Sequence, residues 1–183
     1  MRTALEKHFD HCQQKGCITS YPEITSYFED PPGEGFVRRV ADADFEPDRH
    51  FTVHNINGRP VQLVAVDKCL ITQGTKRCDC VFYEGNDVYF VEFKLRAEDR
   101  EAVDDRRIGT RLREAWEQLL TTVLLFENEG FISRNNEVRA YAYVGYGPII
   151  PAPTTTILSL AEEFDDLIQF SADFDVKDSA SFY

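Results

Sequence analysis

A two-residue turn, Gly85-Asn86, separates two apolar segments and restricts how this part of the chain can fold. Both residues tolerate a positive φ, as the tight turns of antiparallel hairpins require. The flanking residues 77–83 and 88–95 are rich in Val, Phe, Tyr and Cys, which predicts two strands. The sequence therefore predicts a β-hairpin in which Glu84 lies opposite Asp87.

The same register places Asp79 directly opposite Glu92, with Cβ atoms about 5 Å apart. Facing carboxylates repel each other, and in apolar strands both also lose their hydration. A divalent cation between them offsets these costs, and Mg²⁺ or Mn²⁺ is the expected ion because hard cations prefer carboxylate and water oxygens. Lys94 follows Glu92 on the same strand face, where its ammonium can offset the acids or orient an attacking water.

A purely structural interpretation has Asp79 capping a strand and Glu92 forming an exposed edge pair with Lys94. Residues 88–95, however, are apolar on both faces of the predicted strand, which is typical of a covered central strand. Ionic side chains in such a strand favour the metal site over the structural interpretation.

Asp79, followed after twelve residues by Glu92-Phe93-Lys94, resembles the PD-(D/E)xK, or restriction-endonuclease-like, nuclease superfamily. Members place the Asp on the second core strand and the Glu-x-Lys on the third, and the next helix often carries a Gln, which Gln118 matches. The resemblance covers about residues 61–145. It implies catalytic roles for Asp79, Glu92, Lys94 and Gln118, with Mg²⁺ or Mn²⁺ held by Asp79 and Glu92 and the backbone carbonyl of Phe93.

Two positions depart from the family pattern. Cys78 stands before Asp79, where the family often has Pro. The acidic residue that members carry on the first helix has two candidates here, Glu6 and Glu23, and the sequence leaves both open.

The rest of the chain predicts an α/β (α+β) fold with a mixed central sheet flanked by helices, a restriction-endonuclease-like core. Apolar spacing predicts helices at 3–15 (ended by Gly16), 22–28, 107–127 and 158–170, and strands at 61–66, 68–72 and 138–144. We expect three parts: a helical and loop extension (1–60) with residues 33–60 mostly loops, the core (61–150), and a C-terminal helix with a frayed acidic tail (151–183).

The five cysteines, an odd number, predict free thiols rather than a disulfide framework, in a cytoplasmic protein. The N-terminus lacks the pattern of a secretory signal, and the longest apolar stretch, 119–126, is too short to span a membrane. Cys78 and Cys80 have poor spacing for zinc, and His8 and His11 with Cys12 are a weaker zinc alternative.

The net charge of −12 argues against nucleic-acid binding through the whole surface, but allows a local basic groove. The best candidate for gripping phosphates is an arginine run leading into the long helix: Arg106, Arg107, Arg111 and Arg113. A solvated, charged helix start is the alternative.

The resulting hypothesis is a metal-dependent nuclease acting on DNA or RNA, with a homodimer or a protein partner to help hold the substrate. The alternative is a catalytically inactive nuclease-fold protein, an accessory or immunity-type protein whose acidic surface binds a partner. An enzyme acting on small nucleotides is a third possibility.

Overall fold

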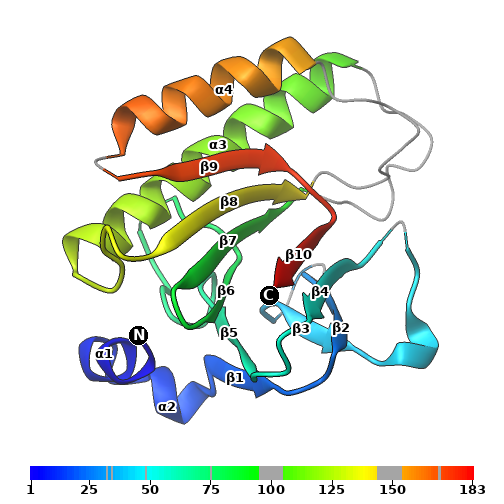
Figure 1. Ribbon diagram of the computed structural model, residues 1–183, viewed down its shortest axis with the longest axis vertical. Helices are drawn as coiled ribbons and strands as arrows, with labels where there is room; N and C mark the ends of the chain where they lie inside the picture. Colours follow the sequence, from blue (N-terminus) through cyan, green and yellow to red (C-terminus); the bar gives the residue numbers. More distant parts are fainter. Residues whose placement is uncertain are drawn as a thin grey trace.

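The computed structural model describes residues 1–31, 33, 35–47, 49–74, 76–94, 105–143, 154–168 and 170–183, and of 105–108 and 154 only the backbone. These residues form a mixed α+β fold in three layers (Figure 1): helices, a six-stranded sheet and a four-stranded sheet. None of the described helices is long and apolar enough to cross a membrane.

The six-stranded central sheet has the order β1-β5-β6-β7-β8-β9. Neighbours from β1 to β7 are antiparallel, and β7, β8 and β9 run parallel to one another. The strands are β1 (Ile18–Tyr21), β5 (Val61–Ala65), β6 (Cys80–Glu84), β7 (Asp87–Phe93), β8 (Glu137–Tyr143) and β9 (Ala172–Val176). The parallel step from β7 to β8 requires a crossover, which a long helix provides.

That helix, α3 (Asp105–Asn128), packs on β7 and β8, and α4 (Thr154–Leu167) packs on α3 and β9. The predicted buried face of α3 is confirmed, since Leu112, Leu119, Val123 and Phe126 are fully buried. The short helices α1 (Arg2–His8) and α2 (Cys12–Lys15) contribute to the same hydrophobic core. The helix predicted at 3–15 is therefore two helices, although Gly16 ends the second in the left-handed conformation, as expected.

The second sheet, with order β10-β4-β2-β3, covers the opposite face of the central sheet. Its strands are β10 (Ser179–Phe182), β4 (Phe51–Asn55), β2 (Thr25–Glu29) and β3 (Arg38–Val40), with a 3₁₀ turn η1 (Asp42–Asp44) after β3. Phe28 and Phe51 pack against Phe82 of β6, with ring centroids 4.7 and 6.0 Å apart.

This sheet corrects the predictions for the first 60 residues. The segment 22–28 is not a helix: it contains β2, in which Ser26 and Phe28 are buried alternately and pair with β4. Residues 33–60 are not mostly loops either, because they contain β3, η1 and β4. These short segments alternate only weakly between apolar and polar residues. They form strands because partners distant in sequence bury one of their faces.

The C-terminal residues also differ from the prediction of a frayed acidic tail. After α4 the chain forms β9 at the edge of the central sheet and β10 beside β4. The tail is ordered because Phe174 and Phe182 are buried, while Asp178, which lies between them in the sequence, is exposed. The strand predicted at 68–72 is a turn instead, in which Lys68 adopts a positive φ of 63°.

A disulfide joins Cys17 to Cys69, contrary to the expectation of free thiols throughout. Cys17 comes directly before β1, and Cys69 lies in the turn after β5. Antiparallel pairing of these strands, continued by the hydrogen bond from Ala65 N–H to the Cys17 carbonyl, brings the two Cα atoms to 5.5 Å. That separation lies in the range of disulfides. Cys12, Cys78 and Cys80 are buried free thiols.

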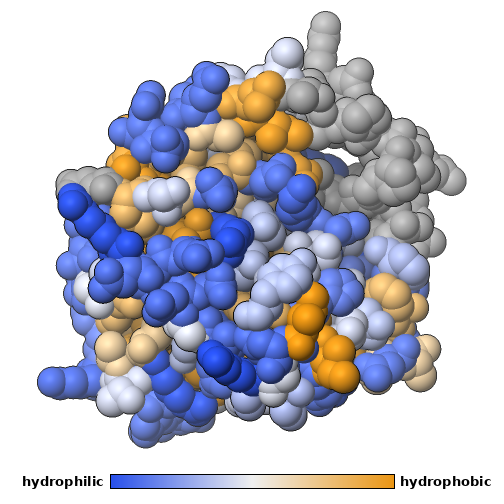
Figure 2. Space-filling model, in the orientation of Figure 1, coloured by the Kyte–Doolittle hydropathy of each residue, from blue (hydrophilic) through white to orange (hydrophobic). Residues whose placement is uncertain are grey.

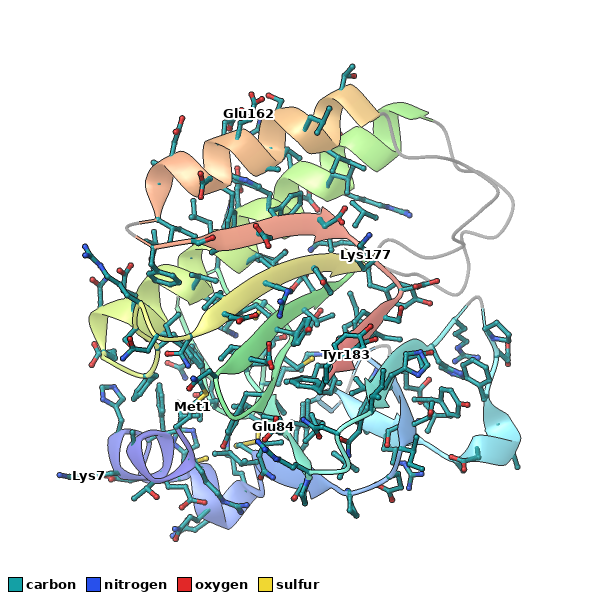
Figure 3. The ribbon with its side chains drawn as sticks, in the orientation of Figure 1. Met1, Lys7, Glu84, Glu162, Lys177 and Tyr183 are labelled. Atoms are coloured by element: carbon teal, nitrogen blue, oxygen red, sulfur yellow. A yellow bond between two sulfur atoms is a disulfide. The ribbon has the colours of Figure 1, made fainter. Side chains whose placement is uncertain are left out.

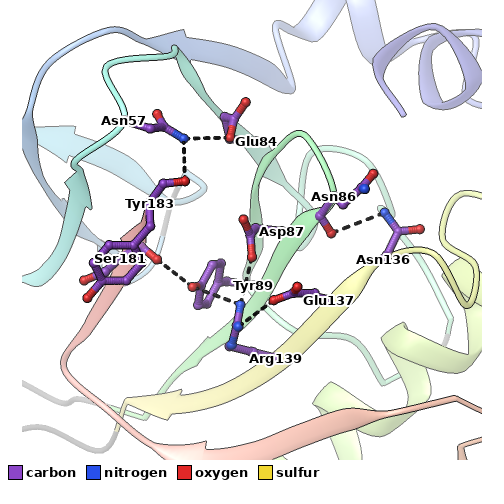
Figure 4. A network of polar contacts seen from close by, with 10 residues as sticks. All are labelled: Asn57, Glu84, Asn86, Asp87, Tyr89, Asn136, Glu137, Arg139, Ser181 and Tyr183. Carbon is purple, nitrogen blue, oxygen red and sulfur yellow. Dashed lines mark hydrogen bonds and ion pairs between the residues drawn. The ribbon is translucent and has the colours of Figure 1, made fainter.

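The predicted hairpin register is confirmed, since Glu84 pairs with Asp87 and Cys80 with Val91. Polar contacts around the turn hold this hairpin against its neighbours (Figure 4). Arg139 of β8 donates to Asp87 and to the Tyr89 hydroxyl, and that hydroxyl donates to the Ser181 carbonyl of β10. The hairpin is therefore tied to both sheets at its turn, while its open end carries Asp79 and Glu92.

Candidate active site

The hairpin and α3 bring together the four site residues predicted from the sequence. Asp79 directly precedes β6, Glu92 lies near the end of β7, and Lys94 directly follows β7. Gln118 reaches them from α3. These side chains lie between the central sheet and the helix layer, where Val88 and Phe90, four and two residues before Glu92, pack in the core on α3.

Asp79 is held firmly and is only 7% exposed. Its Oδ2 atom accepts a hydrogen bond of 2.6 Å from the backbone N–H of Phe93. Its own carbonyl accepts the N–H groups of Val66 and Asp67, at 2.9 and 3.2 Å. The turn after β5 and the end of β7 thus fix both the backbone and the side chain of Asp79.

Glu92 is 2% exposed and has one satisfied carboxylate oxygen. Its Oε1 atom lies 2.8 Å from Nζ of Lys94, while its Oε2 atom is buried without a hydrogen-bond partner. An unpaired buried carboxylate oxygen is costly, so it calls for a proton or a cation.

Lys94 and Gln118 form the other half of the site. The Lys94 ammonium donates to Oε1 of Gln118, and Nε2 of Gln118 donates to the Arg77 carbonyl at 2.9 Å. Because the amide of Gln118 is anchored at its nitrogen, its oxygen faces Lys94. The lysine is thereby held between Glu92 and Gln118, and these contacts account for two of its three N–H donors.

Burial raises the pKa of Asp79 to about 7, and the negative charge of Asp30 adds to the increase. The hydrogen bond from Phe93 and the charge of Lys94 oppose it. Burial also raises the pKa of Glu92 well above its ordinary value, with the charge of Asp79 as the next cause. Near neutral pH the pair therefore holds a proton that a cation would have to displace.

Asp30 is a site residue that the sequence did not indicate. It directly follows β2 of the second sheet, and of all neighbouring charges its own acts most strongly on Asp79. Its pKa is raised by burial, while the charges of Lys68 and Lys94 lower it. Only the packing of the second sheet on the first brings Asp30 to Asp79, because 48 residues separate the two in the sequence.

The two N-terminal acids considered from the sequence have other partners. Glu6 pairs with Arg2 at 2.9 Å and accepts a hydrogen bond from Gln13. The hydrogen bonds from Gln13 and Arg2 lower the pKa of Glu6. Glu23 pairs with Arg39 at 3.1 Å. In this structure Asp30, rather than either of them, is the N-terminal acid that acts on the Asp79 carboxyl.

The site fits a metal ion that retains water ligands. Among the described residues, no three or more His, Cys, Asp and Glu side chains are grouped so as to hold a metal on their own. Mg²⁺ is commonly held by one or two carboxylates, with water and substrate phosphates completing its shell. The paired carboxyls of Asp79 and Glu92, with the unpartnered Oε2 atom, meet that requirement.

The weaker metal alternatives have structural roles. His11 contacts the carbonyls of Cys69 and Leu70 at 3.0 and 3.1 Å, and His8 lies 3.4 Å from Glu129. Cys80 lies on the face of β6 that packs against the second sheet. Cys78 does not share that face: its backbone N–H donates to Thr122 of α3, because it lies before the regular alternation of β6 begins.

The arginine run is only partly described. Arg113 pairs with Glu163 of α4 at 2.6 Å and stacks over Trp116, so it helps to join the two helices. The side chains of Arg106 and Arg107 lie outside the described residues. Arg111 already has a partner. Arg113 is thus already partnered, which weakens the prediction of a phosphate grip at that residue.

The chain was compared with models of protein families, with curated proteins and with solved structures, and none of them matches it.

Proposed function

We propose that this protein is a divalent-metal-dependent nuclease that hydrolyses phosphodiester bonds in DNA or RNA. The proposal is carried by the buried carboxyl pair of Asp79 and Glu92, with an unpartnered oxygen on Glu92 and the Lys94 ammonium 2.8 Å from its other oxygen. Two buried carboxyls beside a half-buried ammonium are a costly arrangement, and such clusters are typical of functional sites.

The topology around the site also supports a restriction-endonuclease-like core. Three antiparallel strands, β5, β6 and β7, are followed by α3 and by β8, which is parallel to β7. The Asp precedes the second of these strands, the Glu-x-Lys ends the third, and Gln118 comes from the next helix. The superfamily that the motif resembles has the same order of strands, helix and site residues.

In the proposed reaction, Asp79 and Glu92 would hold Mg²⁺ or Mn²⁺. The bound ion would stabilise charge on a phosphoryl oxygen and lower the pKa of a water. Lys94 would orient the attacking water through the donor that Glu92 and Gln118 leave, and its positive charge would stabilise the charge that builds up on the phosphate. Gln118 would hold the lysine in that direction.

The test is cleavage of labelled single- and double-stranded DNA and RNA with Mg²⁺ or Mn²⁺. Wild type and Lys76→Ala should cleave, and Lys94→Ala should not. Lys76 is a matched control because it is an exposed lysine that also contacts α3. Its partner there is Glu117, the neighbour of Gln118. Cleavage by Lys94→Ala at the wild-type rate, or none by wild type with either metal, would contradict the proposal.

A second function, binding of a partner by an inactive nuclease-like core, is favoured by the outer face of α4. Glu162, Asp165 and Asp166 are exposed there, together with Leu158 and Leu167, and Figure 3 shows Glu162 pointing away from the sheet. The view in Figure 2 is largely hydrophilic with small hydrophobic patches, as expected for a chain of net charge −12.

Reversal of these three acids to lysine separates the two functions. In a partner-binding protein it should weaken capture of a basic partner in a salt-dependent way, while Lys94→Ala leaves capture unchanged. In a nuclease, Lys94→Ala should abolish cleavage, while reversal of the three acids should leave cleavage unchanged.

A further inference from the structure

A cavity of about 430 Å³ lies in the second sheet, away from the carboxyl pair. It is bounded by the end of β2, by β3 and by the segment between β3 and β4, which includes η1 (Figure 1). Three arginines and a buried histidine line it: Arg38, Arg39, Arg49 and His50. Its volume is in the range of pockets that take small ligands.

Hydrogen-bond donors remain unused at this cavity. The Nε atom of Arg39 is buried and has no partner, although its terminal nitrogens pair with Glu23 and Asp42 at 3.1 and 3.2 Å. The contacts of Arg49 with Glu29 and Glu46 are 3.6 and 3.8 Å, which is longer than a hydrogen bond. An arginine held so loosely can turn to an incoming anion at little cost.

His50 provides a third donor. Its Nδ1 atom accepts the backbone N–H of Glu46 at 2.9 Å, so the neutral ring carries its proton on Nε2. Burial lowers the pKa of His50, which favours that neutral form. The Nε2 atom lies 3.7 Å from Glu29, again too far for a good hydrogen bond.

The acids of the cavity reduce its positive charge without cancelling its donors. Among the described residues that line it, the acids Glu29, Asp44 and Glu46 stand against three arginines, whereas the whole chain carries a net charge of −12. Glu29 is engaged by Arg38, whose Nε and Nη2 atoms donate to a single carboxylate oxygen at 2.9 and 2.7 Å. Glu29 is therefore the group that a bound anion has to compete with.

We propose that this cavity binds a phosphate group through Arg39, Arg49 and His50. Guanidinium groups bind both carboxylate and phosphate. Donors on three residues of two segments suit a tetrahedral anion with three or four acceptor oxygens better than a planar one with two. The room in the cavity also exceeds what a small carboxylate needs.

The cavity is linked to the candidate active site by one peptide bond. Glu29 lines the cavity, and the next residue, Asp30, acts on Asp79. The phosphate belongs either to a free phosphate compound or to a nucleic-acid strand. Its binding does not depend on the proposed nuclease activity, because the site uses none of the residues of the carboxyl pair.

The test is calorimetric titration of the full chain, with EDTA present so that no strand is cleaved. The probes are inorganic pyrophosphate and short DNA oligonucleotides with a 5′-phosphate or a 5′-hydroxyl. We expect pyrophosphate to bind and Arg49→Gln to weaken it about tenfold, as loss of a charge-assisted hydrogen bond would. Arg59→Gln is the matched control, an exposed arginine paired with Glu84 at 3.3 Å outside the cavity.

Glu29→Gln should change the affinity in the opposite direction. The variant keeps an acceptor for Arg38 but removes the negative charge that competes with the anion, so pyrophosphate should bind several-fold more tightly. Melting curves establish that each variant is folded. Preference for the 5′-phosphate oligonucleotide, lost in Arg49→Gln, would identify a strand end as the source, and equal binding of both oligonucleotides an internal phosphate. Binding of pyrophosphate alone would identify a free phosphate compound. No binding of any probe at about 10 mM, or an equal loss in Arg59→Gln, would overturn the proposal.

Discussion

The carboxylate of Asp79 accepts a 2.6 Å hydrogen bond from the backbone N–H of Phe93, the residue between Glu92 and Lys94. This contact joins the start of β6 to the end of β7 at the point where the side chains of the candidate site converge. It uses one oxygen of the Asp79 carboxylate. The backbone geometry of the hairpin thus brings its two acids together.

The first prediction concerns pH. The pKa of Asp79 is raised to about 7 in the folded protein, against about 3.9 in an unfolded chain, so the folded state binds more protons between these values. Without metal, the free energy of unfolding should therefore fall as the pH rises from about 4 to 7, by up to about 1.4 kcal/mol for each pKa unit.

Urea denaturation in EDTA across this range measures the effect. Asp79→Asn should flatten the dependence, while the control Asp173→Asn, at an exposed position of β9, should retain it. If the free energy of unfolding of wild type instead rises between these pH values, Asp79 and Glu92 are ionised in the folded protein without a cost in stability.

The second prediction concerns metal binding. A cation that binds only the folded protein stabilises it by about 2.7 kcal/mol at a hundredfold excess over its Kd. Thermal melts should therefore shift upward with millimolar Mn²⁺, and more at pH 8 than at pH 6, because the ion displaces the proton of the carboxyl pair. Glu92→Gln should remove the shift. Glu84→Gln, in the same hairpin but bound to Asn57 and Arg59, should keep it.

The third prediction assigns Gln118 a positioning role. Gln118→Leu removes the contact with Lys94 and should lower kcat for cleavage about tenfold, as expected for one hydrogen bond to a charged group. KM and the Mn²⁺-induced shift in melting should stay close to wild type, since neither depends on the direction of Lys94. The control is Gln62→Leu on β5. If KM rises while kcat is unchanged, Gln118 contributes to substrate binding instead.

The fourth prediction concerns the disulfide. Cys17 and Cys69 close a loop of 52 residues, and removal of such a crosslink typically costs about 2–4 kcal/mol. A reducing agent should lower the melting temperature of wild type but not of Cys17→Ser, which should already melt lower. Because the same turn donates two N–H groups to the Asp79 carbonyl, the variant should also bind Mn²⁺ less tightly. An identical wild-type melting curve with and without reductant would show that the crosslink does not form in solution.

The sequence alone determined the local part of the site. The Gly85-Asn86 turn sets the register, and strict alternation along the strands puts Asp79, Glu92 and Lys94 together, all within sixteen positions. The long helix could be predicted from its apolar spacing, and Gln118 from the family resemblance. Local geometry of this kind depends on neighbours in the chain, which the sequence displays directly.

Tertiary structure decided what depends on distant partners. The strands of the second sheet are short and weakly patterned, and they form because Phe28, Phe51 and Phe182 are buried against the central sheet. That packing brings Asp30 to Asp79, while strand pairing brings Cys17 to Cys69. Contacts between residues far apart in sequence follow from how whole faces fit together, and no local pattern encodes that fit.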